Sequence, residues 1–370
     1  MYVCRKFALV DDFLEIKLNE RREQEALRRL RLSEGKIDFS SNDYLGIVKN
    51  GLLGANTLAH GSTGSRLLTG NYPLAEETER ELAGFHRAEA GLLFNSGYDA
   101  NLGVLSCVPQ RGDTILYDQL SHASIRDGIR LSFAQSFSFN HNDVGDLERR
   151  LKTVCGGASR VFVVTESVFS MDGDLAPLEA ILGLCRRYGT HCILDEAHGT
   201  GVIGAVGEGL AQSLGLQTEF LARIHTFGKA VGCHGAIVLG SERLRRFLVN
   251  FCRPLIYTTA LPPASVRAIA DAYRLFPTMQ AEREQLQLLI DRFRQAAIGY
   301  QRLDSPTPIQ VVVVPGNAAV RKLAELLQQA GLDIRPILYP TVPRGSERLR
   351  IVIHSFNTAA EIDQLAGLLR

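Results

Sequence analysis

The sequence lacks a strong net charge, which limits the ligands that its surface as a whole could attract. Lys and Arg together number 41 against 40 Asp and Glu, so the formal net charge is +1. A nearly neutral surface exerts no general attraction on nucleic acid or an anionic membrane, and an anionic ligand must be met by locally placed groups. We therefore expect small-molecule substrates, with no nucleic acid and no membrane among the partners.

Regular cysteine pairing and long apolar runs are also missing. The 7 cysteines are odd in number and include no C-x-x-C pair, which favours a reducing compartment over a disulfide framework or a zinc site. The N-terminal residues lack the apolar centre of a signal peptide, and no stretch approaches ~20 apolar residues. The expectation is a cytoplasmic protein without a metal site, whose cysteines are buried as small apolar residues.

The length of the chain and its apolar runs predict two lobes. A chain of 370 residues is long for a single small core and short for three ordinary domains. Within residues 41–262, short apolar runs alternate with helical patterns, as in a parallel sheet covered on both faces. The runs assigned to buried parallel strands are TILYD, RVFVVTE, HCILDEA, ARIHTF and GAIVLG.

Different patterns flank this central region. Residues 11–32 place apolar side chains at helical spacing among many charges, so residues 1–40 are expected to form an arm with a solvated helix. From 263 to 370, two long helical patterns lead into strands and a further helix, which predicts a small α+β domain. The fold class is thus α/β with a second, smaller lobe, and ligands of such folds gather at the carboxyl ends of the strands.

One lysine stands in an otherwise apolar, glycine-rich stretch. Lys229 lies within HTFGKAVGCHGAIVLG, directly after an apolar run. Burying an unpaired ammonium is costly, so the position needs a chemical reason. A Schiff base to an aldehyde cofactor supplies one, because desolvation lowers the pKa of the amine and lets it attack carbonyls and move protons. Taken alone, the pattern fits an exposed loop lysine equally well.

An acid and a histidine follow the apolar strand HCIL. Asp195 ends this run and His198 comes three residues later. A buried carboxylate at a strand end could pair with a protonated pyridine nitrogen, while the histidine hydrogen-bonds the phenolic oxygen of the same ring. A helix N-cap beside a core histidine would produce the same pattern.

Further residues suggest a phosphate cradle beside a flat ring. The amides of Gly97 and Tyr98 open a predicted helix and can face a phosphate. Ser170 and Thr226 end or follow strands and could add hydroxyl donors, and His122, after another strand, could stack on a ring. Each also has an ordinary structural interpretation, as a helix cap or a core histidine. Their joint order, always at a strand end or helix start, favours one shared site.

Together these segments resemble the α-oxoamine synthases, pyridoxal-phosphate (PLP) enzymes of fold type I. The resemblance runs from about residue 20 to the C-terminus. It rests on the motifs SSNDYLG, GSTGSRLLTGN, FNSGYDAN, SHASIRDG, ESVFSMDGD, LDEAHGTG, HTFGK, IYTTALPP and PTVPRGSERLRI. It implies the PLP-dependent transferase fold, with a mostly parallel seven-stranded sheet in the large domain, PLP as the cofactor, and a homodimer with shared active sites.

The resemblance also implies roles for individual residues. Lys229 matches the Schiff-base lysine, His122 the ring-stacking residue, Asp195 the partner of the pyridine nitrogen and His198 the partner of the ring oxygen. The residues expected to hold the phosphate are Gly97, Tyr98, Ser170, Thr226 and, reaching into a neighbouring subunit, Thr259. The residues expected to contact substrate are Arg28, Asn42, His122, Arg335, Thr341 and Arg350.

Two of these substrate positions have physical support of their own. An arginine binds a carboxylate through two parallel hydrogen bonds, so Arg335 or Arg350 could anchor the carboxylate of an amino acid. Arg28 lies in the charged N-terminal pattern, where a solvated helix face is an equal alternative. Only the resemblance makes it a contact of the acyl substrate.

The implied activity is the condensation of an amino acid with an acyl thioester, with release of CO2. The segment GSTGSR is similar to that of serine palmitoyltransferases and to that of the biotin-pathway members. The segments SSNDYLG and NSGYDAN, with a short N-terminus, favour the members that join L-alanine to a pimeloyl thioester, on CoA or a carrier protein, in biotin biosynthesis. Enzymes of the serine palmitoyltransferase, 2-amino-3-ketobutyrate CoA ligase and 5-aminolevulinate synthase types remain alternatives. From other classes, so do a plain aminotransferase and a non-catalytic binding or regulatory protein of the same fold.

Overall fold

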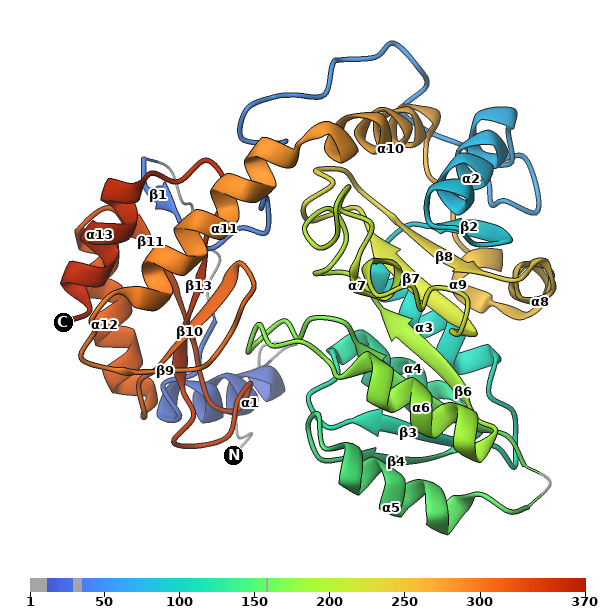
Figure 1. Cartoon of the computed structure of the whole chain (residues 1–370), viewed down its shortest axis with the longest axis horizontal. Coiled ribbons are helices and arrows are strands. Elements are labelled where there is room, and N and C mark those ends of the chain that lie inside the picture. Colours follow the sequence, from blue (N-terminus) through green and yellow to red (C-terminus); the bar gives the residue numbers. More distant parts are fainter. Residues whose placement is uncertain (1–11, 29–34, 158) are drawn as a thin grey trace, which may run out of the picture.

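Two lobes make up the described part of the chain, which is residues 12–28, 35–157 and 159–370 of a computed structural model (Figure 1). The large lobe holds the central strands of the sequence, and the small lobe holds the C-terminal ones. The helices α10 (Pro263–Leu275) and α11 (Gln280–Gln295), with the short η1 (Phe276–Thr278) between them, lead from one lobe to the other along the top of Figure 1.

The large lobe is built on a seven-stranded sheet with the order β2-β8-β7-β6-β5-β3-β4. Its strands are β2 (Ala90–Phe94), β3 (Thr114–Asp118), β4 (Gln135–Phe139), β5 (Val161–Glu166), β6 (His191–Asp195), β7 (Ala222–Thr226) and β8 (Ala236–Gly240). The strand β8 runs antiparallel to β2 and β7, and the other neighbours are parallel. The predicted fold class, with its mostly parallel seven-stranded sheet, is therefore confirmed.

The prediction that GAIVLG forms a parallel strand is wrong. This segment is β8, which follows β7 after the short connection 227–235. A parallel neighbour needs a crossover of a dozen or more residues, usually a helix, whereas an antiparallel neighbour needs only a turn. The short connection therefore reverses the direction of β8.

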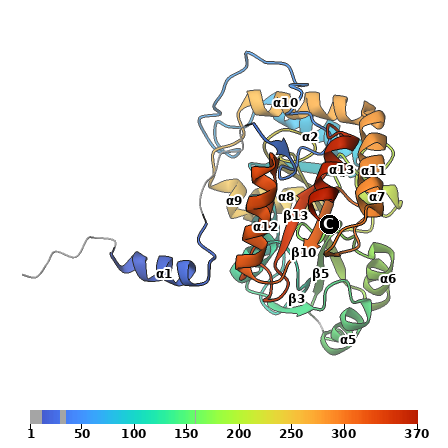
Figure 2. The ribbon, with the colours of Figure 1, turned by 90° about the vertical axis from the view of Figure 1, so that its left-hand side faces the viewer.

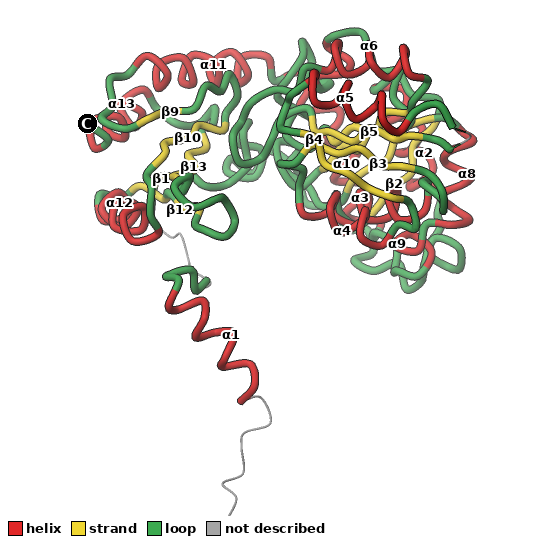
Figure 3. The backbone as a smooth tube through the Cα atoms, turned by 90° about the horizontal axis from the view of Figure 1, so that it is seen from below, coloured by secondary structure: helices red, strands yellow, loops and turns green. Residues whose placement is uncertain are grey.

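Helices cover both faces of the large sheet, giving three layers (Figure 3). On one face lie α3 (Gly97–Cys107), α4 (Ala123–Leu131) and α8 (Glu242–Phe251), and on the other α5 (Val144–Val154) and α6 (Leu178–Tyr188). Side chains alternate between the faces of a strand. Ile115 thus belongs to the apolar cluster under α3 and α4, while its neighbour Leu116 belongs to the cluster under α5 and α6. The remaining helices of this lobe are α2 (Pro73–Phe85), α7 (Leu210–Ser213) and α9 (Arg253–Ile256).

The small lobe has a four-stranded antiparallel sheet with the order β12-β13-β10-β9. Its strands are β9 (Gln301–Arg302), β10 (Ile309–Val313), β12 (Arg335–Ile337) and β13 (Arg348–Val352), and its helices include α12 (Asn317–Gln329) and α13 (Ala359–Leu368). The early strand β1 (Ile37–Asp38) pairs with β11 (Leu332–Asp333) beside it. The strands of the two main sheets fall within 41–262 and 263–370, and the domain boundaries themselves remain a prediction.

The N-terminal helix α1 (Asp12–Glu23) projects away from both lobes (Figure 2). It is shorter than the pattern over residues 11–32 predicts, since the described helix ends at Glu23 and residues 29–34 lie outside the described part. Glu25 has φ of 51°, a left-handed conformation that an α-helix cannot continue through. Arg321 of α12 then binds the carbonyl oxygens of Glu25 and Leu27 at 2.6 and 3.3 Å.

Two expectations about the chain as a whole concern membranes and cysteines. Among the described residues, no helix is long and apolar enough to cross a membrane. Six of the cysteines are free thiols, and Cys185, Cys192 and Cys252 are fully buried. Cys4 lies outside the described residues.

Candidate active site

The predicted site residues converge where three parallel strands end. Asp195 is the last residue of β6, Lys229 follows β7 by three residues, and Glu166 ends β5 directly beside Asp195 in the strand register. Because the carboxyl ends of parallel strands share one edge of the sheet, these groups meet although they are far apart in the sequence. The edge thus combines one amine with two carboxyl groups.

The surroundings of Lys229 tune its basicity. Desolvation lowers the pKa of its amine, Asp195 and Glu166 work against that shift, and Arg350 adds to it. A lowered pKa leaves more of the amine unprotonated at neutral pH, which is the form that attacks a carbonyl and accepts a proton. The site therefore suits the predicted Schiff-base role.

A chain of hydrogen bonds joins Asp195 to His122. Asn101 donates from Nδ2 to Asp195 Oδ2 at 2.6 Å and to Ser124 Oγ at 3.1 Å, and Ser124 Oγ lies 2.8 Å from His122 Nδ1. The backbone amide of Ala197 donates to the other oxygen of Asp195 at 2.8 Å. The carboxylate is thus oriented on two sides, while the ring of His122 stays exposed at the start of α4.

Glu166 is a site residue that the sequence interpretation missed. It is 3% exposed and accepts the backbone amide of His122 at 2.6 Å. Burial raises the pKa of Glu166 well above its usual range, and the neighbouring Asp195 raises it further. The sequence did contain a signal for it. Glu166 is the last residue of RVFVVTE, whose apolar pattern predicts a buried parallel strand, and functional groups gather at the ends of such strands.

A second chain of contacts leads from His198 towards the small lobe. The hydroxyl of Tyr44 lies 2.7 Å from His198 Nδ1 and 3.2 Å from Asn42 Oδ1, which in turn accepts from Arg350 Nη2 at 3.1 Å. Burial lowers the pKa of His198 well below its usual range, helped by the charges of Lys229 and Arg350. The ring is therefore neutral at neutral pH. Tyr44 is another residue that the sequence interpretation did not single out.

The expected phosphate residues also come together in part. A Cβ added at Gly97 would lie 3.3 Å from Thr226 Cβ and Oγ1, so the start of α3 and the end of β7 nearly touch. The first amides of a helix are unpaired and attract anions, and Thr226 adds a hydroxyl. Tyr98 is exposed and its hydroxyl binds Asp127. Ser170 lies half-buried in the turn after β5.

The remaining predicted residues lie on β12 and β13 or at the surface. Arg335 and Arg350 are cross-strand partners on β12 and β13, and Arg335 pairs with Asp333 at 2.9 Å. Arg28 Nη2 donates to Thr341 Oγ1 at 3.0 Å, so these two distant positions meet at the surface. The expected contact of Thr259 with a neighbouring subunit remains a prediction; its side chain is exposed, and its carbonyl accepts Asn95 Nδ2 at 2.9 Å.

Replacing Asn101 by alanine should impair the predicted PLP-dependent activity without unfolding the protein. The substitution removes a donor from Asp195, so the carboxylate is held less firmly. Losing one charge-assisted hydrogen bond corresponds to about 1.5–3 kcal/mol, so we expect a loss of roughly tenfold or more in kcat/KM. Steady-state kinetics and the absorption spectrum of bound PLP measure it. Asn250→Ala, at an exposed helix position, is the control, and equal rates for both variants would contradict the role of Asn101.

Residues 34–369 match the family described as aminotransferase class I and II. The chain belongs to this family. An 8-amino-7-oxononanoate synthase of Emericella nidulans is 40% identical over 385 residues, covering 96% of this chain and 93% of its own. That of Cellvibrio japonicus is 39% identical over 381 residues, covering 97% and 95%.

Solved structures show the same relationship. A serine palmitoyltransferase of Sphingomonas wittichii superimposes with a TM-score of 0.88 at 28% identity, covering 98% of this chain and 97% of its own. An 8-amino-7-oxononanoate synthase of Francisella tularensis gives a TM-score of 0.74 at 28% identity, covering 91% and 97%. The predicted resemblance to the α-oxoamine synthases is confirmed by these relatives.

The residues present fit the expected cofactor, PLP. Another serine palmitoyltransferase structure, with a TM-score of 0.87 at 27% identity, is described with PLP. In this chain a carboxylate, a neutral histidine and an amine of lowered pKa surround one strand edge, which are the groups that a pyridine ring, its phenolic oxygen and an aldehyde require. The helix terminus at Gly97 and the hydroxyl of Thr226 supply donors for a phosphate.

Proposed function

We propose that this protein catalyses the decarboxylative condensation of L-alanine with a pimeloyl thioester, giving 8-amino-7-oxononanoate, CO2 and a free thiol. Curated relatives of that name, 39–40% identical over nearly the whole chain, are the observation that supports this function best. The geometry agrees, because the site combines an amine of lowered pKa with an oriented carboxylate and a nearby arginine.

Each group at the strand edge has a task in this reaction. Bound PLP supplies an electron sink for negative charge at the Cα of the substrate. Lys229 binds the cofactor, and its freed amine takes the Cα proton and later returns a proton. Asp195 would pair with the protonated pyridine nitrogen, His198 would hydrogen-bond the ring oxygen, and His122 would stack on the ring.

Arg350 is proposed to hold the carboxylate of the amino acid. Its Nε donates to Ser170 O at 2.6 Å and its Nη2 to Asn42 Oδ1 at 3.1 Å, so the guanidinium is held on two sides. An arginine binds a carboxylate most strongly through two parallel bonds. Holding this group sets the orientation of the bond that breaks when CO2 leaves. Arg335, the cross-strand neighbour, adds positive charge.

The acyl thioester and a second subunit complete the proposal. Arg28 and Thr341, in contact at the surface, are placed to meet the acyl substrate, on CoA or a carrier protein. The site is proposed to lie at a homodimer interface in the cytoplasm, with Thr259 reaching the phosphate of the neighbouring subunit. Leu68 and Tyr257 support an interface, since they are 78% and 73% exposed and large exposed apolar side chains mark contact surfaces.

Amino-acid selectivity tests the proposed function. The purified protein with PLP is supplied with pimeloyl-CoA and L-alanine, L-serine or glycine, and thiol and CO2 are measured together. We expect equal amounts of both products with alanine and at least about tenfold less with the others, which corresponds to ~1.4 kcal/mol. Turnover with serine and palmitoyl-CoA would favour a serine palmitoyltransferase. Turnover with a 2-oxoacid and no CO2 would favour an aminotransferase, and no turnover at all a binding protein.

A further inference from the structure

A short hairpin of the large lobe, Ser167–Ala176, lies between the two lobes. Val168 and Leu175 form an isolated antiparallel bridge, and the amide of Gly173 donates to Phe169 O at 2.8 Å. These ten residues are called the hairpin. It follows β5 directly, so it leaves the sheet at the same edge that carries Glu166 and Asp195.

On one side the hairpin is held by strand β13 of the small lobe. Arg348 and Arg350 are two residues apart, so their side chains leave the same face of the strand, while Leu349 is buried in the core. Arg348 forms an ion pair with Asp172, with side chains 9% and 17% exposed, and Arg350 Nε donates to Ser170 O. Arg348 and Arg350 therefore bind two residues of the hairpin, Asp172 and Ser170, which are two positions apart.

Side chains of the small lobe also bind the backbone of the hairpin. The carbonyl of Gly173 accepts from Ser305 Oγ and Thr307 Oγ1, both at 2.8 Å. Gly173 has φ of +76°, and a Cβ there would lie 2.2 Å from Ile309 O. Only glycine fits this close approach of backbone to backbone. The backbone of the small lobe therefore packs directly against the turn of the hairpin.

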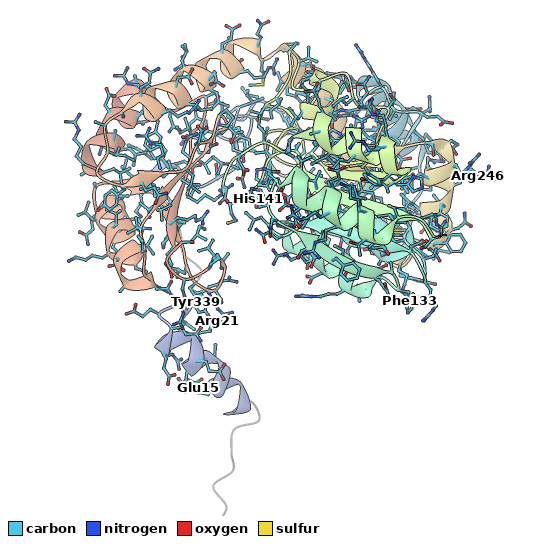
Figure 4. All side chains as sticks on the ribbon, turned by 60° about the horizontal axis from the view of Figure 1, so that its bottom comes forward. Glu15, Arg21, Phe133, His141, Arg246 and Tyr339 are labelled. Atoms are coloured by element: carbon cyan, nitrogen blue, oxygen red, sulfur yellow. The ribbon has the colours of Figure 1, made fainter. Side chains whose placement is uncertain are left out.

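On its other side the hairpin is tied to the large sheet by His141. Its Nδ1 lies 2.9 Å from Asp118 Oδ1 at the end of β3, and its Nε2 lies 2.8 Å from Asp174 Oδ2. Figure 4 shows His141 on the side of the large lobe that faces the small lobe. Burial lowers the pKa of His141, but the hydrogen bonds to Asp118 and Asp174 outweigh that effect and raise it to about 10. The imidazole is therefore a cation at neutral pH.

The same residues do not favour a metal ion. Ligand atoms of His141, Asp172 and Asp174 lie within 4.8 Å of one another, which is close enough to share a cation. However, Asp172 is paired with the guanidinium of Arg348, and Asp174 with the protonated His141. The carboxylates are already neutralised, and a protonated imidazole cannot coordinate a metal.

We propose that Asp172 and His141 are positioning residues that set Arg350 for the amino-acid carboxylate; this rests on the proposed function of Arg350. The carbonyl of Ser170 fixes the Nε edge of Arg350 only while the hairpin is anchored. Asp172 anchors it to the strand that carries Arg350, and His141 anchors it to the sheet that carries the rest of the site. The two anchors thus set the distance between carboxylate and cofactor across the lobes.

The test replaces Asp172 by asparagine and His141 by glutamine in the full-length protein with PLP. We expect the dissociation constant of L-alanine, read from the spectral change of bound PLP, and its KM to rise about tenfold, the ratio that ~1.4 kcal/mol produces. We expect kcat and the KM of pimeloyl-CoA to stay within about twofold, well under that energy. Amide hydrogen exchange of Ser167–Ala176 should accelerate.

Controls separate positioning from general stability. Asp363→Asn breaks the exposed small-lobe pair of Asp363 with Arg292 and should change none of these values. In an Arg350→Ala background, Asp172→Asn should add nothing to the loss of alanine affinity. An additive effect there, or a fall in kcat with unchanged alanine affinity, would overturn the positioning role alone.

The proposed function can fail separately. If the protein accepts serine or glycine in place of alanine, the same measurements with that amino acid test the two anchors. If the wild-type protein shows no spectral response to any of the three amino acids, both the proposed function and the positioning role are overturned.

Discussion

Turnover should fall by about 10³- to 10⁴-fold when Lys229 is replaced by alanine, within the range that a positioned acid–base group supplies. The substitution removes both the amine that binds the cofactor and the base that takes the Cα proton. It also removes a buried polar amine whose desolvation Asp195 and Glu166 only partly compensate, so stability should not decrease. Initial rates of thiol and CO2 release, with thermal unfolding alongside, measure both effects.

The matched control is another lysine that touches no catalytic group. Lys49 lies on the surface, 5.9 Å from the centre of the Phe356 ring, and Lys49→Ala should keep wild-type rates. Small exogenous amines should partly restore turnover to the Lys229→Ala protein, because they replace the missing base. Retention of a tenth or more of the wild-type rate by Lys229→Ala would rule out the role assigned to this lysine.

Stability should fall steeply as the pH drops below about 6.5, the ordinary pKa of histidine. His86 and His225 are fully buried with ring centroids 3.9 Å apart. Burial lowers the pKa of each ring well below its usual range, and the neighbouring Arg223 lowers it further. Their side-chain hydrogen bonds are with neutral hydroxyls, Tyr273 on His86 and Thr200 on His225. The backbone hydrogen bond of His86 with Glu208 opposes the lowering of its pKa without reversing it. Protonating either ring in the folded protein therefore costs free energy.

The direction of the pH dependence follows from the lowered pKa values of these two histidines. Above pH ~6.5 both histidines are neutral in the folded and unfolded states, and the full stability is present. Below it the unfolded chain takes up protons on these two rings that the folded chain refuses, so this pair lowers the free energy of unfolding by up to about 2.7 kcal/mol per pH unit. The buried His198, whose pKa is also lowered, contributes in the same direction. His141 has a raised pKa, so its contribution is fully present below pH ~6.5 and is lost only as the pH rises towards about 10.

Urea unfolding of the holoprotein between pH 5 and 7.5 measures this slope. Replacing His225 by leucine should reduce it by up to about 1.4 kcal/mol per pH unit, because one buried ring no longer takes up a proton on unfolding. His191→Gln, at an exposed position at the start of β6, should leave it unchanged. A stability that is flat from pH 7 to pH 5.5, or a ring of His86 that titrates near pH 6.5 in the folded protein, would contradict the prediction.

Some elements were easier to predict than others for physical reasons. Strands buried on both faces, such as β5 and β6, appear as continuous apolar runs and were found at nearly their observed bounds. The edge strand β4, QSFSF, is mostly exposed, and its alternation with serine and glutamine hid it. The direction of β8 depended on a connection length that the apolar pattern does not report.

The sequence by itself determined the chemistry: Lys229, Asp195, His198 and His122 stand in motifs whose order along the chain pointed to one family and one cofactor. Residue types at strand ends are a local property, and local properties can be read along the chain. Only the tertiary structure decided which groups support them, because Glu166 beside Asp195 and Asn101 between Asp195 and Ser124 depend on strand order and helix docking. The contacts of Arg348 and Arg350 with the hairpin likewise join residues about 180 positions apart, and no local pattern in the sequence encodes such contacts.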